Sequence, residues 1–483
     1  MMDATLMIGN RDVAASEGAT YDRSDPITGA VATRAAAASV TDAIAAVDCA
    51  AAAFPAWAAL GPNARRALLM KAADALQARS GEICAAMAAE TGATMGWGGF
   101  NVHLATSMLR EAAALTTQVQ GETIPSDRPG CIAIAIRQPA GVVLGIAPWN
   151  APIILGVRAV ALPLACGNTV VLKASEMCPR THLLIGEAFR DAGFPDGVVN
   201  VVTNAPADAA AVVEALVRHK AVRRVNFTGS TKVGRIIGRL CGEELKPALL
   251  ELGGKAPLIV LEDADIGEAV AAAAFGAYMN SGQICMSTEK IIVVDAIADK
   301  FLKAFVAKVK TLKAGDPRDG AAPLGSVIDP AAVATVERLI ADAVAKGGTL
   351  HSAAEPKGTI LSAAVIDHVT AAMAIYGDES FGPITGIIRV KDEEEAISVA
   401  NDTDYGLTAS VFTGDTSRGL RVAARLETGM CHINGPTVHD EAQMPFGGIK
   451  ASGYGRFGGK AGIAEFTELR WITIDTLPVH YPI

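Results

Sequence analysis

Short apolar runs alternate with amphipathic stretches between residues 141 and 252. The apolar runs are rich in β-branched residues and lie at 141–148, 168–175, 198–203, 222–229 and 247–252. The stretches between them have apolar positions at helical spacing from about Ile153, at 181–192, at 207–219 and from about Val233. Strands that are apolar throughout and separated by helices are typical of a parallel sheet covered on both faces. This segment therefore predicts a doubly wound α/β domain.

The same alternation starts again after Gly253. Apolar runs lie at 256–261, 290–295, 382–390, 408–414 and 429–435, and helical patterns lie near 265–280, 297–312, 393–402 and 416–427. Two successive arrays joined near Gly253 and Gly254 predict two doubly wound α/β domains, with a ligand cleft between them.

The remaining segments extend this plan. The first 120 residues are Ala-rich and predict mainly helices that pack onto the first α/β domain. The alternation in ELRWITID near the C-terminus predicts a strand, and an apolar strand at a chain end favours pairing with another subunit. We therefore assign 1–120 and 141–252 to the first domain and 253–452 to the second. Segments 121–140 and 453–483 are expected to form a small β arm that joins two or four identical subunits.

Composition and charge narrow the class of protein. The chain has 483 residues, of which 51% are apolar, so it is long enough for two or three domains. Its net charge is −9 and its lysines and arginines are scattered, which argues against a nucleic-acid partner. Its eight cysteines include no C-x-x-C pair and no Cys/His cluster, which argues against disulfides and against a metal site. We expect reduced thiols and a cytoplasmic protein.

Neither export nor a membrane span is expected. The N-terminal residues MMDATLMIGNRD lack the basic and apolar regions of a secretory signal. Residues 138–157 are uncharged over a length that can span a bilayer. This segment contains three prolines and three glycines, so it reads better as a strand, a turn and the start of a buried helix.

Two glycine motifs resemble nucleotide-binding signatures, and neither holds in context. GYGRFG at 453–458 matches G-x-G-x-x-G, but no predicted strand precedes it and too few residues follow for a βαβ unit. GSTKVG at 229–234 has P-loop glycine spacing, but Arg235 and Ile236 stand where Lys and Ser or Thr are required. A strand still ends at Gly229 and Ser230 where a helix begins, so this turn is either a phosphate-sized anion site or an ordinary βα turn with a serine cap.

Three residues in separate motifs are candidates for chemistry. Cys285 lies in the Gly- and Ser-containing stretch SGQICMST, and it is either an inert packed thiol or a nucleophile. Glu251 ends the apolar strand PALLEL beside two glycines that leave room near its carboxylate, so it is either a cap or a general base with a raised pKa. Asn150 in PWNAP is either an N-cap or a donor to an oxyanion.

Taken together, the motifs resemble those of the aldehyde dehydrogenase superfamily over nearly the whole chain. They occur in the family's order: PWN with Asn150, KASE from Lys173 to Glu176, FTGS with Gly229 and Ser230, LELGGK with Glu251, GQIC with Cys285, ESFGP with Glu379 and Phe381, and PFGG with Phe446. Each motif is weak alone, whereas seven in register are highly specific.

The resemblance implies a mechanism. Cys285 attacks an aldehyde carbon, and Asn150 with the Cys285 backbone N–H holds the oxyanion of the thiohemiacetal. Hydride transfer to nicotinamide leaves a thioester, which water activated by Glu251 hydrolyses to a carboxylic acid.

The resemblance also implies NAD as cofactor and no metal. It places Lys173 and Glu176 at the adenosine ribose, Ser230 at the pyrophosphate, and Glu379 with Phe381 at the nicotinamide ribose. A carboxylate at position 176 accepts hydrogen bonds from ribose hydroxyls and repels a 2′-phosphate, which favours NAD over NADP. Without the resemblance, Lys173 and Glu176 would read as a surface ion pair. The remaining expected cofactor residues are Ile146, Pro148, Trp149, Ser175, Phe227, Gly229, Val233, Leu252 and Gly253.

Within the family, GQICMSTEK and the C-terminal motifs look most like the branch that oxidises aromatic aldehydes such as salicylaldehyde and vanillin. Arg158 is expected near the substrate, where it holds a phenolate or stacks on a ring, unless it forms a core or interface ion pair. Trp97 is either a substrate wall or structural packing, and Ile284, Met286 and Phe446 complete the expected apolar pocket. An aliphatic aldehyde or semialdehyde is the main alternative substrate. A non-redox thiol hydrolase and an inactive scaffold protein are remote alternatives.

Overall fold

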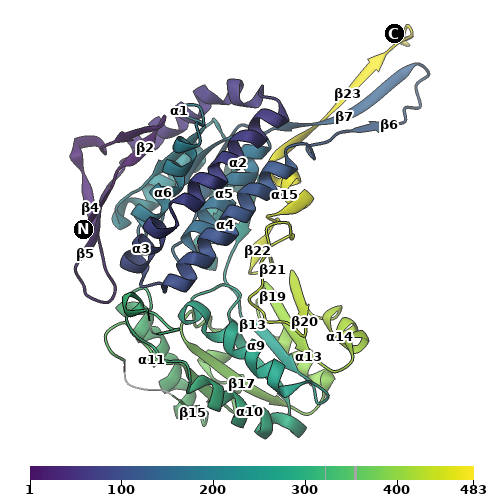
Figure 1. Ribbon diagram of the computed structural model, residues 1–483. Coiled ribbons are helices and arrows are strands. Elements are labelled where there is room, and N and C mark those ends of the chain that lie inside the picture. The colour runs from purple at the N-terminus through teal and green to yellow at the C-terminus, as the bar shows by residue number, and fades with distance from the viewer. Residues whose placement is uncertain (321, 353–355) are drawn as a thin grey trace.

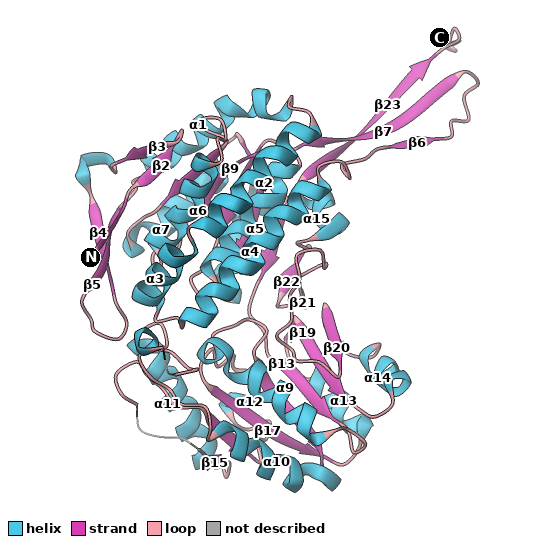
Figure 2. Cartoon of the chain, viewed as in Figure 1, coloured by secondary structure: helices cyan, strands magenta, loops and turns pink. Residues whose placement is uncertain are grey.

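Two α/β bodies and a projecting β arm make up the chain in the computed structural model (Figure 1). The structure describes residues 1–320, 322–352 and 356–483. Helices cover the sheets of both bodies, and the arm extends away from them with the C-terminus at its far end (Figure 2). This arrangement confirms the predicted fold class.

The first body is built on an eight-stranded sheet. Its five central strands, β12, β11, β8, β9 and β10, are all parallel, whereas the outer strands β22, β2 and β3 pair antiparallel. In sheet order the strands are β22 (Gly453–Tyr454), β12 (Ala248–Glu251), β11 (Val222–Thr228), β8 (Val142–Ile146), β9 (Thr169–Lys173), β10 (Val199–Val202), β2 (Leu6–Ile8) and β3 (Arg11–Val13).

Alternate residues of each central strand are buried on opposite faces of this sheet. In β8, Val143 faces a core shared with α5 and α6, and α2, α3 and α4 pack outside that layer. Val142 and Leu144 face α1, α7 and α8 on the other side. The helices are α1 (Val40–Ala58), α2 (Pro62–Ala78), α3 (Ser80–Thr91), α4 (Met95–Leu115), α5 (Pro152–Ala165), α6 (Pro179–Asp191), α7 (Ala209–Arg218) and α8 (Thr231–Glu243). Burial on both faces explains why these strands are apolar throughout.

The second body is built on a seven-stranded sheet that is parallel except at the edge strand β15. Its strands, in sheet order, are β15 (Thr349–His351), β16 (Ala364–Asp367), β17 (Ile384–Val390), β14 (Thr288–Val294), β13 (Ala256–Val260), β19 (Thr408–Phe412) and β20 (Met430–Ile433). One face packs on α9 (Ile266–Tyr278) and α10 (Asp295–Val309). The other face packs on α11 (Pro330–Ala345), α12 (Ala374–Gly377), α13 (Glu393–Asn401) and α14 (Thr416–Ala423).

Three smaller sheets complete the chain. The arm consists of β6 (Glu122–Ile124), β7 (Cys131–Pro139) and β23 (Thr467–Asp475), and β23 pairs antiparallel with β7 along its whole length. The N-terminal sheet consists of β1 (Met2–Ala4), β5 (Val31–Ala36) and β4 (Thr20–Ser24). A two-stranded sheet joins β18 (Tyr405–Gly406) to β21 (Ile449–Lys450).

All ten strands predicted in the two arrays are present, and so is the predicted C-terminal strand. The prediction for the N-terminus was incomplete, because residues 2–36 form five short strands before the first helix. These strands have three to six residues each, too few to produce a clear alternation, and they pair both with neighbouring segments, as β2 does with β3, and with a distant one, as β2 does with β10.

Two further differences concern the C-terminal segment. Residues 453–454 pair with β12 at the edge of the large sheet, and α15 (Gly459–Glu465) packs against α4 and α5. The predicted arm boundary at residue 453 was therefore wrong, since only β23 of this segment belongs to the arm sheet. The GYGRFG segment forms no βαβ unit, in agreement with its rejection as a dinucleotide fingerprint.

The uncharged segment 138–157 comprises the end of β7, all of β8 and the start of α5. Among the described residues, one helix, α1, is long and apolar enough to cross a bilayer by length and composition alone. One face of this helix packs against β9, β10 and α7 of the first body.

Candidate active site

Two cavities meet at Cys285. The larger spans about 1850 Å³, open solvent included, and lies beyond the carboxyl ends of β8, β9, β11 and β12, with Glu379 and Phe381 of the second body also in its lining. The smaller spans about 670 Å³, measured in the same way, and is lined by residues of α4, α5, α9 and the chain around 438–446. Cys285 and Asn150 line both cavities. A ligand in either cavity is therefore in reach of the same sulfur atom.

An irregular turn after α9 presents Cys285. The one-turn helix η3 (Met279–Gly282) contains Asn280 and Ser281 with φ values of 50° and 54°, a backbone conformation that is rare for residues with side chains. Gly282 also has a positive φ, and a Cβ there would lie 2.1 Å from the Gly382 carbonyl oxygen. Such strain persists only where surrounding contacts hold it, and it often marks a functional site.

Asn150 is buried beside this turn. Its Nδ2 donates to the Gln283 carbonyl at 3.0 Å, and its own carbonyl accepts from Trp97 Nε1 at 2.9 Å and from Asn280 Nδ2 at 3.0 Å. The N-cap of α5 is Ala151, without a side-chain cap, so the N-cap interpretation of Asn150 was wrong. An asparagine amide has two N–H donors, and one donor to Gln283 leaves the other for a ligand.

Glu251 ends β12 and is 1% exposed. Neither carboxylate oxygen has a hydrogen-bond partner among the described residues. Burial raises the pKa of Glu251 to about 7, although the charge of Arg158 opposes this rise. The carboxylate is therefore close to half ionised at neutral pH, which suits a group that takes up and releases protons.

Burial also raises the pKa of the Cys285 thiol, and the neighbouring Glu251 carboxylate raises it further. The general expectation that nearby cations or N–H dipoles activate a nucleophilic thiol is therefore not met here, since only Arg158 acts in that direction. The thiol is protonated at neutral pH, so it needs a proton acceptor when it attacks. The neighbouring Glu251 carboxylate can accept this proton.

Every residue that the sequence suggested for a cofactor site lines the larger cavity. These residues are Ile146, Pro148, Trp149, Lys173, Ser175, Glu176, Phe227, Gly229, Ser230, Val233, Leu252, Gly253, Glu379 and Phe381. Sequence reasoning missed the wall contributed by the short helix η2 (Pro206–Asp208), by α7 and by the later turns of α8, which includes Pro206, Val213 and Ile237. Apolar residues on a helix carry no local sign of a cavity.

The turn at Ser230 faces this cavity with the N-terminus of α8. The Ser230 side chain caps the helix by accepting from the Val233 N–H at 3.4 Å. The serine-cap interpretation is thus correct. It is compatible with an anion at the same helix end, because the other first-turn N–H groups need partners.

Lys173 and Glu176 form a largely buried ion pair at the cavity wall, and Asn204 Nδ2 donates to the same carboxylate at 3.1 Å. Burial raises the pKa of Glu176, but the Lys173 charge and these hydrogen bonds outweigh it and lower the pKa overall. An ionised carboxylate therefore lines the cavity.

Glu379 closes the cavity near Cys285. A Cβ at Gly253 would lie 2.6 Å from the Glu379 carboxylate, and the Gly254 N–H donates to that carboxylate at 2.9 Å. A Cβ at Gly254 would lie 2.4 Å from the Cys285 carbonyl oxygen. The two glycines thus make room for Glu379 and for the Cys285 backbone, rather than for approach to Glu251 as the sequence suggested.

The smaller cavity contains all five residues expected at a substrate: Trp97, Arg158, Ile284, Met286 and Phe446. Trp97 both lines the cavity and holds Asn150 by the hydrogen bond described above. Arg158 forms a buried ion pair with Asp440, and its guanidinium lies 4.1 Å from the centre of the Phe446 ring. Arg158 therefore forms a buried ion pair and also lines the cavity.

Sequence reasoning missed the other apolar residues of this cavity, among them Phe100, Phe275, Met279 and Val438, and one acid, Asp440. Phe100 is one turn from Trp97 on α4, so helical spacing was the available signal. Asp440 lies in a loop with no motif of its own. Burial raises its pKa, whereas the Arg158 charge opposes that rise.

Comparisons with known proteins agree with this geometry. Residues 13–472 match the aldehyde dehydrogenase family. The chain belongs to the aldehyde dehydrogenase family. It is 60% identical to a vanillin dehydrogenase of Pseudomonas fluorescens over 483 residues, and 47% identical to a salicylaldehyde dehydrogenase of Pseudomonas putida over 482 residues, with 100% of each chain covered.

A solved structure leads to the same family. The crystal structure of a salicylaldehyde dehydrogenase from Pseudomonas putida G7, complexed with salicylaldehyde, has a TM-score of 0.98 to this aldehyde dehydrogenase. The two chains are 46% identical, and the comparison covers 100% of each. Such agreement over the full length extends to both α/β bodies and the arm.

Proposed function

We propose that this aldehyde dehydrogenase oxidises an aromatic aldehyde to the carboxylic acid with NAD, acting as a cytoplasmic homodimer or homotetramer. The observation that carries the proposal is the position of Cys285 at the junction of a long cleft and an apolar pocket. The similarity of the chain to proteins named vanillin and salicylaldehyde dehydrogenase supports the aromatic substrate. The eight cysteines of the chain are all free, which supports a reducing compartment.

Covalent chemistry begins at Cys285. As the sulfur attacks the aldehyde carbon, the thiol proton passes to Glu251, which is the adjacent base. The aldehyde oxygen becomes an oxyanion, and the second N–H of the Asn150 amide stabilises it together with the Cys285 backbone N–H. Trp97 and Asn280 hold the Asn150 backbone, so the amide needs little reorganisation as the charge forms.

The larger cavity fits a nicotinamide dinucleotide. The Glu176 and Glu379 carboxylates accept hydrogen bonds from ribose hydroxyls, and the α8 N-terminus suits a pyrophosphate. Gly253 lacks the Cβ that would displace Glu379. When bound, the dinucleotide supplies the acceptor for the hydride that leaves the thiohemiacetal carbon.

Glu251 acts again in the second half of the reaction. Loss of hydride leaves the acyl group on Cys285 as a thioester, and Glu251 releases the thiol proton to solvent. The ionised carboxylate then takes a proton from a water molecule that attacks the acyl carbon. The sulfur leaves as a thiolate and takes this proton back from Glu251, which frees the carboxylic acid. Glu251 lines the larger cavity, and neither of its oxygens has a partner among the described residues, so a water molecule bound in the cavity would satisfy them.

The choice of NAD over NADP follows from Glu176. Its ionised carboxylate repels a 2′-phosphate, and the Lys173 charge, which could attract the phosphate, is already paired with Glu176.

The pocket favours an aromatic aldehyde over a carboxylated semialdehyde. A semialdehyde carboxylate needs an unpaired cation, whereas the Arg158 charge is neutralised by Asp440. The remaining lining is mainly aromatic and aliphatic, which suits a flat apolar ring.

Steady-state rates with salicylaldehyde, vanillin, benzaldehyde, a linear aliphatic aldehyde and succinate semialdehyde, each with NAD, test the substrate class. We expect the highest kcat/KM with an aromatic aldehyde. Faster turnover of the aliphatic aldehyde or of succinate semialdehyde would reject the aromatic assignment.

Cys285→Ala tests the nucleophile. NADH formation, followed by its absorbance, should be abolished because no thiohemiacetal can form, while NAD binding by calorimetry should persist. NADH formation by the wild type also excludes a non-redox hydrolase and an inactive scaffold. A near-normal rate in the variant would contradict the assignment of Cys285.

A further inference from the structure

The ion pair between Arg158 and Asp440 is built into the wall of the pocket that contains Cys285. Arg158 comes from α5 and Asp440 from the loop after β20, and 282 positions separate them in the chain. Their side chains are 6% and 8% exposed, respectively. The guanidinium also lies near two aromatic rings, 4.1 Å from the centre of Phe446 and 5.8 Å from that of Phe457.

This pair leaves one polar atom unmatched. Asp440 Oδ2 accepts a hydrogen bond from Arg158 Nη2, whereas the buried Oδ1 has no partner among the described residues. A buried acceptor without a partner is unfavourable, because it has lost water and gained nothing in exchange. A ligand that brings a donor into the pocket would remove that deficit.

The charges around this oxygen restrict the ligand. Arg158 already balances the Asp440 charge, so a cationic ligand gains little net attraction, and an anionic ligand meets a second negative charge. The rest of the lining is largely apolar, including Phe100, Leu104, Ile154 and Val438. The matching group is a neutral O–H donor carried on an apolar ring.

We propose that Asp440 accepts a hydrogen bond from a hydroxyl group on the aromatic ring of the substrate, and that it thereby selects hydroxybenzaldehydes over benzaldehydes without a hydroxyl. This inference rests on the proposed aromatic substrate class and adds a requirement to it. Asp440 is a specificity residue: it does not touch the reacting carbon, and Arg158 positions its carboxylate. A site that is built to pair with a hydroxyl discriminates strongly against an analogue lacking it.

The test compares 2-, 3- and 4-hydroxybenzaldehyde with benzaldehyde and with the corresponding methoxybenzaldehydes, with NAD, in the wild type and in Asp440→Asn. Benzaldehyde is the internal reference, because a change in folding or in the reaction at Cys285 affects it as well. The wild type should prefer at least one hydroxy isomer to benzaldehyde and to its methoxy analogue, which cannot donate. In Asp440→Asn that preference should fall about tenfold, equivalent to roughly 1.4 kcal/mol of transition-state binding.

Val438→Ala is the matched control, since Val438 lines the same pocket without a polar side-chain atom. We expect this variant to change kcat/KM for hydroxybenzaldehyde and benzaldehyde by the same factor. Binding provides a second measurement: in the Cys285→Ala background, the preferred hydroxybenzaldehyde should bind about tenfold more weakly once Asp440→Asn is added.

The inference is overturned if the ratio of hydroxybenzaldehyde to benzaldehyde turnover is unchanged in Asp440→Asn, or if the methoxy analogues are used as well as the hydroxy compounds. Failure of the proposed function looks different. In that case the wild type would oxidise aliphatic aldehydes and would turn over no member of the benzaldehyde series efficiently.

Discussion

At the scale of single residues, the unusual environments of Cys285 and Glu251 depend on each other. Burial leaves the Cys285 thiol protonated and brings the pKa of Glu251 to about 7. A thiol with a high pKa is a poor nucleophile without a base, and a buried carboxylate with a pKa near neutrality is a suitable base. The Glu251 carboxylate therefore supplies the base that the protonated Cys285 thiol needs.

Glu251→Gln should slow the attack of Cys285 and lose thioester hydrolysis, because both steps use this carboxylate as the base. An amide takes a proton neither from the thiol nor from water, so we expect about one equivalent of NADH per active site, formed more slowly than in the wild type and followed by a still slower rate. Rapid-mixing absorbance measures both phases. A fast linear rate would show that another base serves.

The pH dependence of the wild type follows from the same carboxylate. Glu251 must be ionised to act as a base, so kcat should fall as the pH decreases through about 7, where its pKa lies. This inflection should be absent from the residual rate of Glu251→Gln. A pH profile of kcat from pH 5.5 to 9 is the measurement, and an inflection that persists in the variant would assign it to another group.

Glu176→Ala should improve the use of NADP relative to NAD. The change removes the charge that repels a 2′-phosphate and releases Lys173 to attract it. We expect the ratio of kcat/KM for NADP to that for NAD to rise at least about tenfold, which corresponds to roughly 1.4 kcal/mol. An unchanged ratio would remove Glu176 from cofactor recognition.

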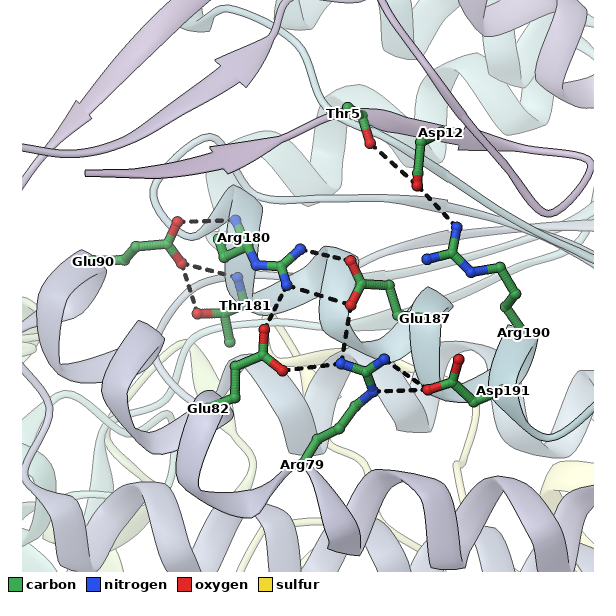
Figure 3. Close-up of polar contacts among 10 residues, drawn as sticks. All are labelled: Thr5, Asp12, Arg79, Glu82, Glu90, Arg180, Thr181, Glu187, Arg190 and Asp191. Atoms are coloured by element: carbon green, nitrogen blue, oxygen red, sulfur yellow. Dashed lines mark hydrogen bonds and ion pairs between the residues drawn. The ribbon is translucent and has the colours of Figure 1, made fainter.

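At the scale of elements, one buried carboxylate supplies the missing cap of a helix. The N-cap residue of α6, Cys178, makes no side-chain cap. Glu90 of α3 accepts instead from the backbone N–H groups of Arg180 and Thr181, at 2.9 and 3.0 Å, and from the Thr181 hydroxyl at 2.6 Å (Figure 3). The cap comes from a residue about 90 positions away, so it ties α3 to α6.

Glu90→Ala should lower the free energy of unfolding by about 2–4 kcal/mol, because it leaves buried N–H groups at the start of α6 without partners. Glu82→Ala is the control. Glu82 pairs with Arg79 and Arg180 in the same network, but its side chain is 45% exposed, so the loss should be about 0–1 kcal/mol. Denaturant unfolding measures both variants, and equal losses would contradict the capping role.

Prediction from sequence succeeded where a pattern repeats within one element. The central strands were found because burial on both faces makes them apolar over their whole length, as in β8 and β13. The N-terminal strands β1 to β5 were missed, since three of them have only three residues and polar side chains interrupt the other two, β4 and β5. The motif residues of the two cavities were found by resemblance, whereas Asp440 and the α7 wall had no local signal.

At the scale of the whole molecule, the arm exposes large apolar side chains to solvent, which is unfavourable in a monomer. Leu469 and Trp471 on β23 are 61% and 73% exposed, and β6 and β23 are edge strands of the arm sheet. Edge strands with exposed apolar residues favour pairing with another chain. This feature supports the proposed homo-oligomer.

Replacing Leu469 and Trp471 together by Glu should shift the enzyme toward monomers, because two charges per subunit would be buried in the contact. Size-exclusion chromatography with light scattering measures the mass. Leu420→Glu is the control, since Leu420 is an exposed residue on α14 of the second body and should leave the mass unchanged. An unchanged mass in the double variant would place the subunit contact elsewhere.

Local sequence was sufficient for the order of the ten predicted strands and of the helices predicted between them, and the sequence motifs, through their resemblance to a family, were sufficient for the identity of the reactive groups. The period of apolar positions reflects burial within each element, and a thiol, a carboxylate and an amide keep their chemistry wherever they lie. Folding settled the pairing of Arg158 with Asp440, the capping of α6 by Glu90, and the meeting of two cavities at Cys285. These features join residues that are far apart in the chain, and their contact depends on how the two sheets and their helices pack, which no local pattern contains.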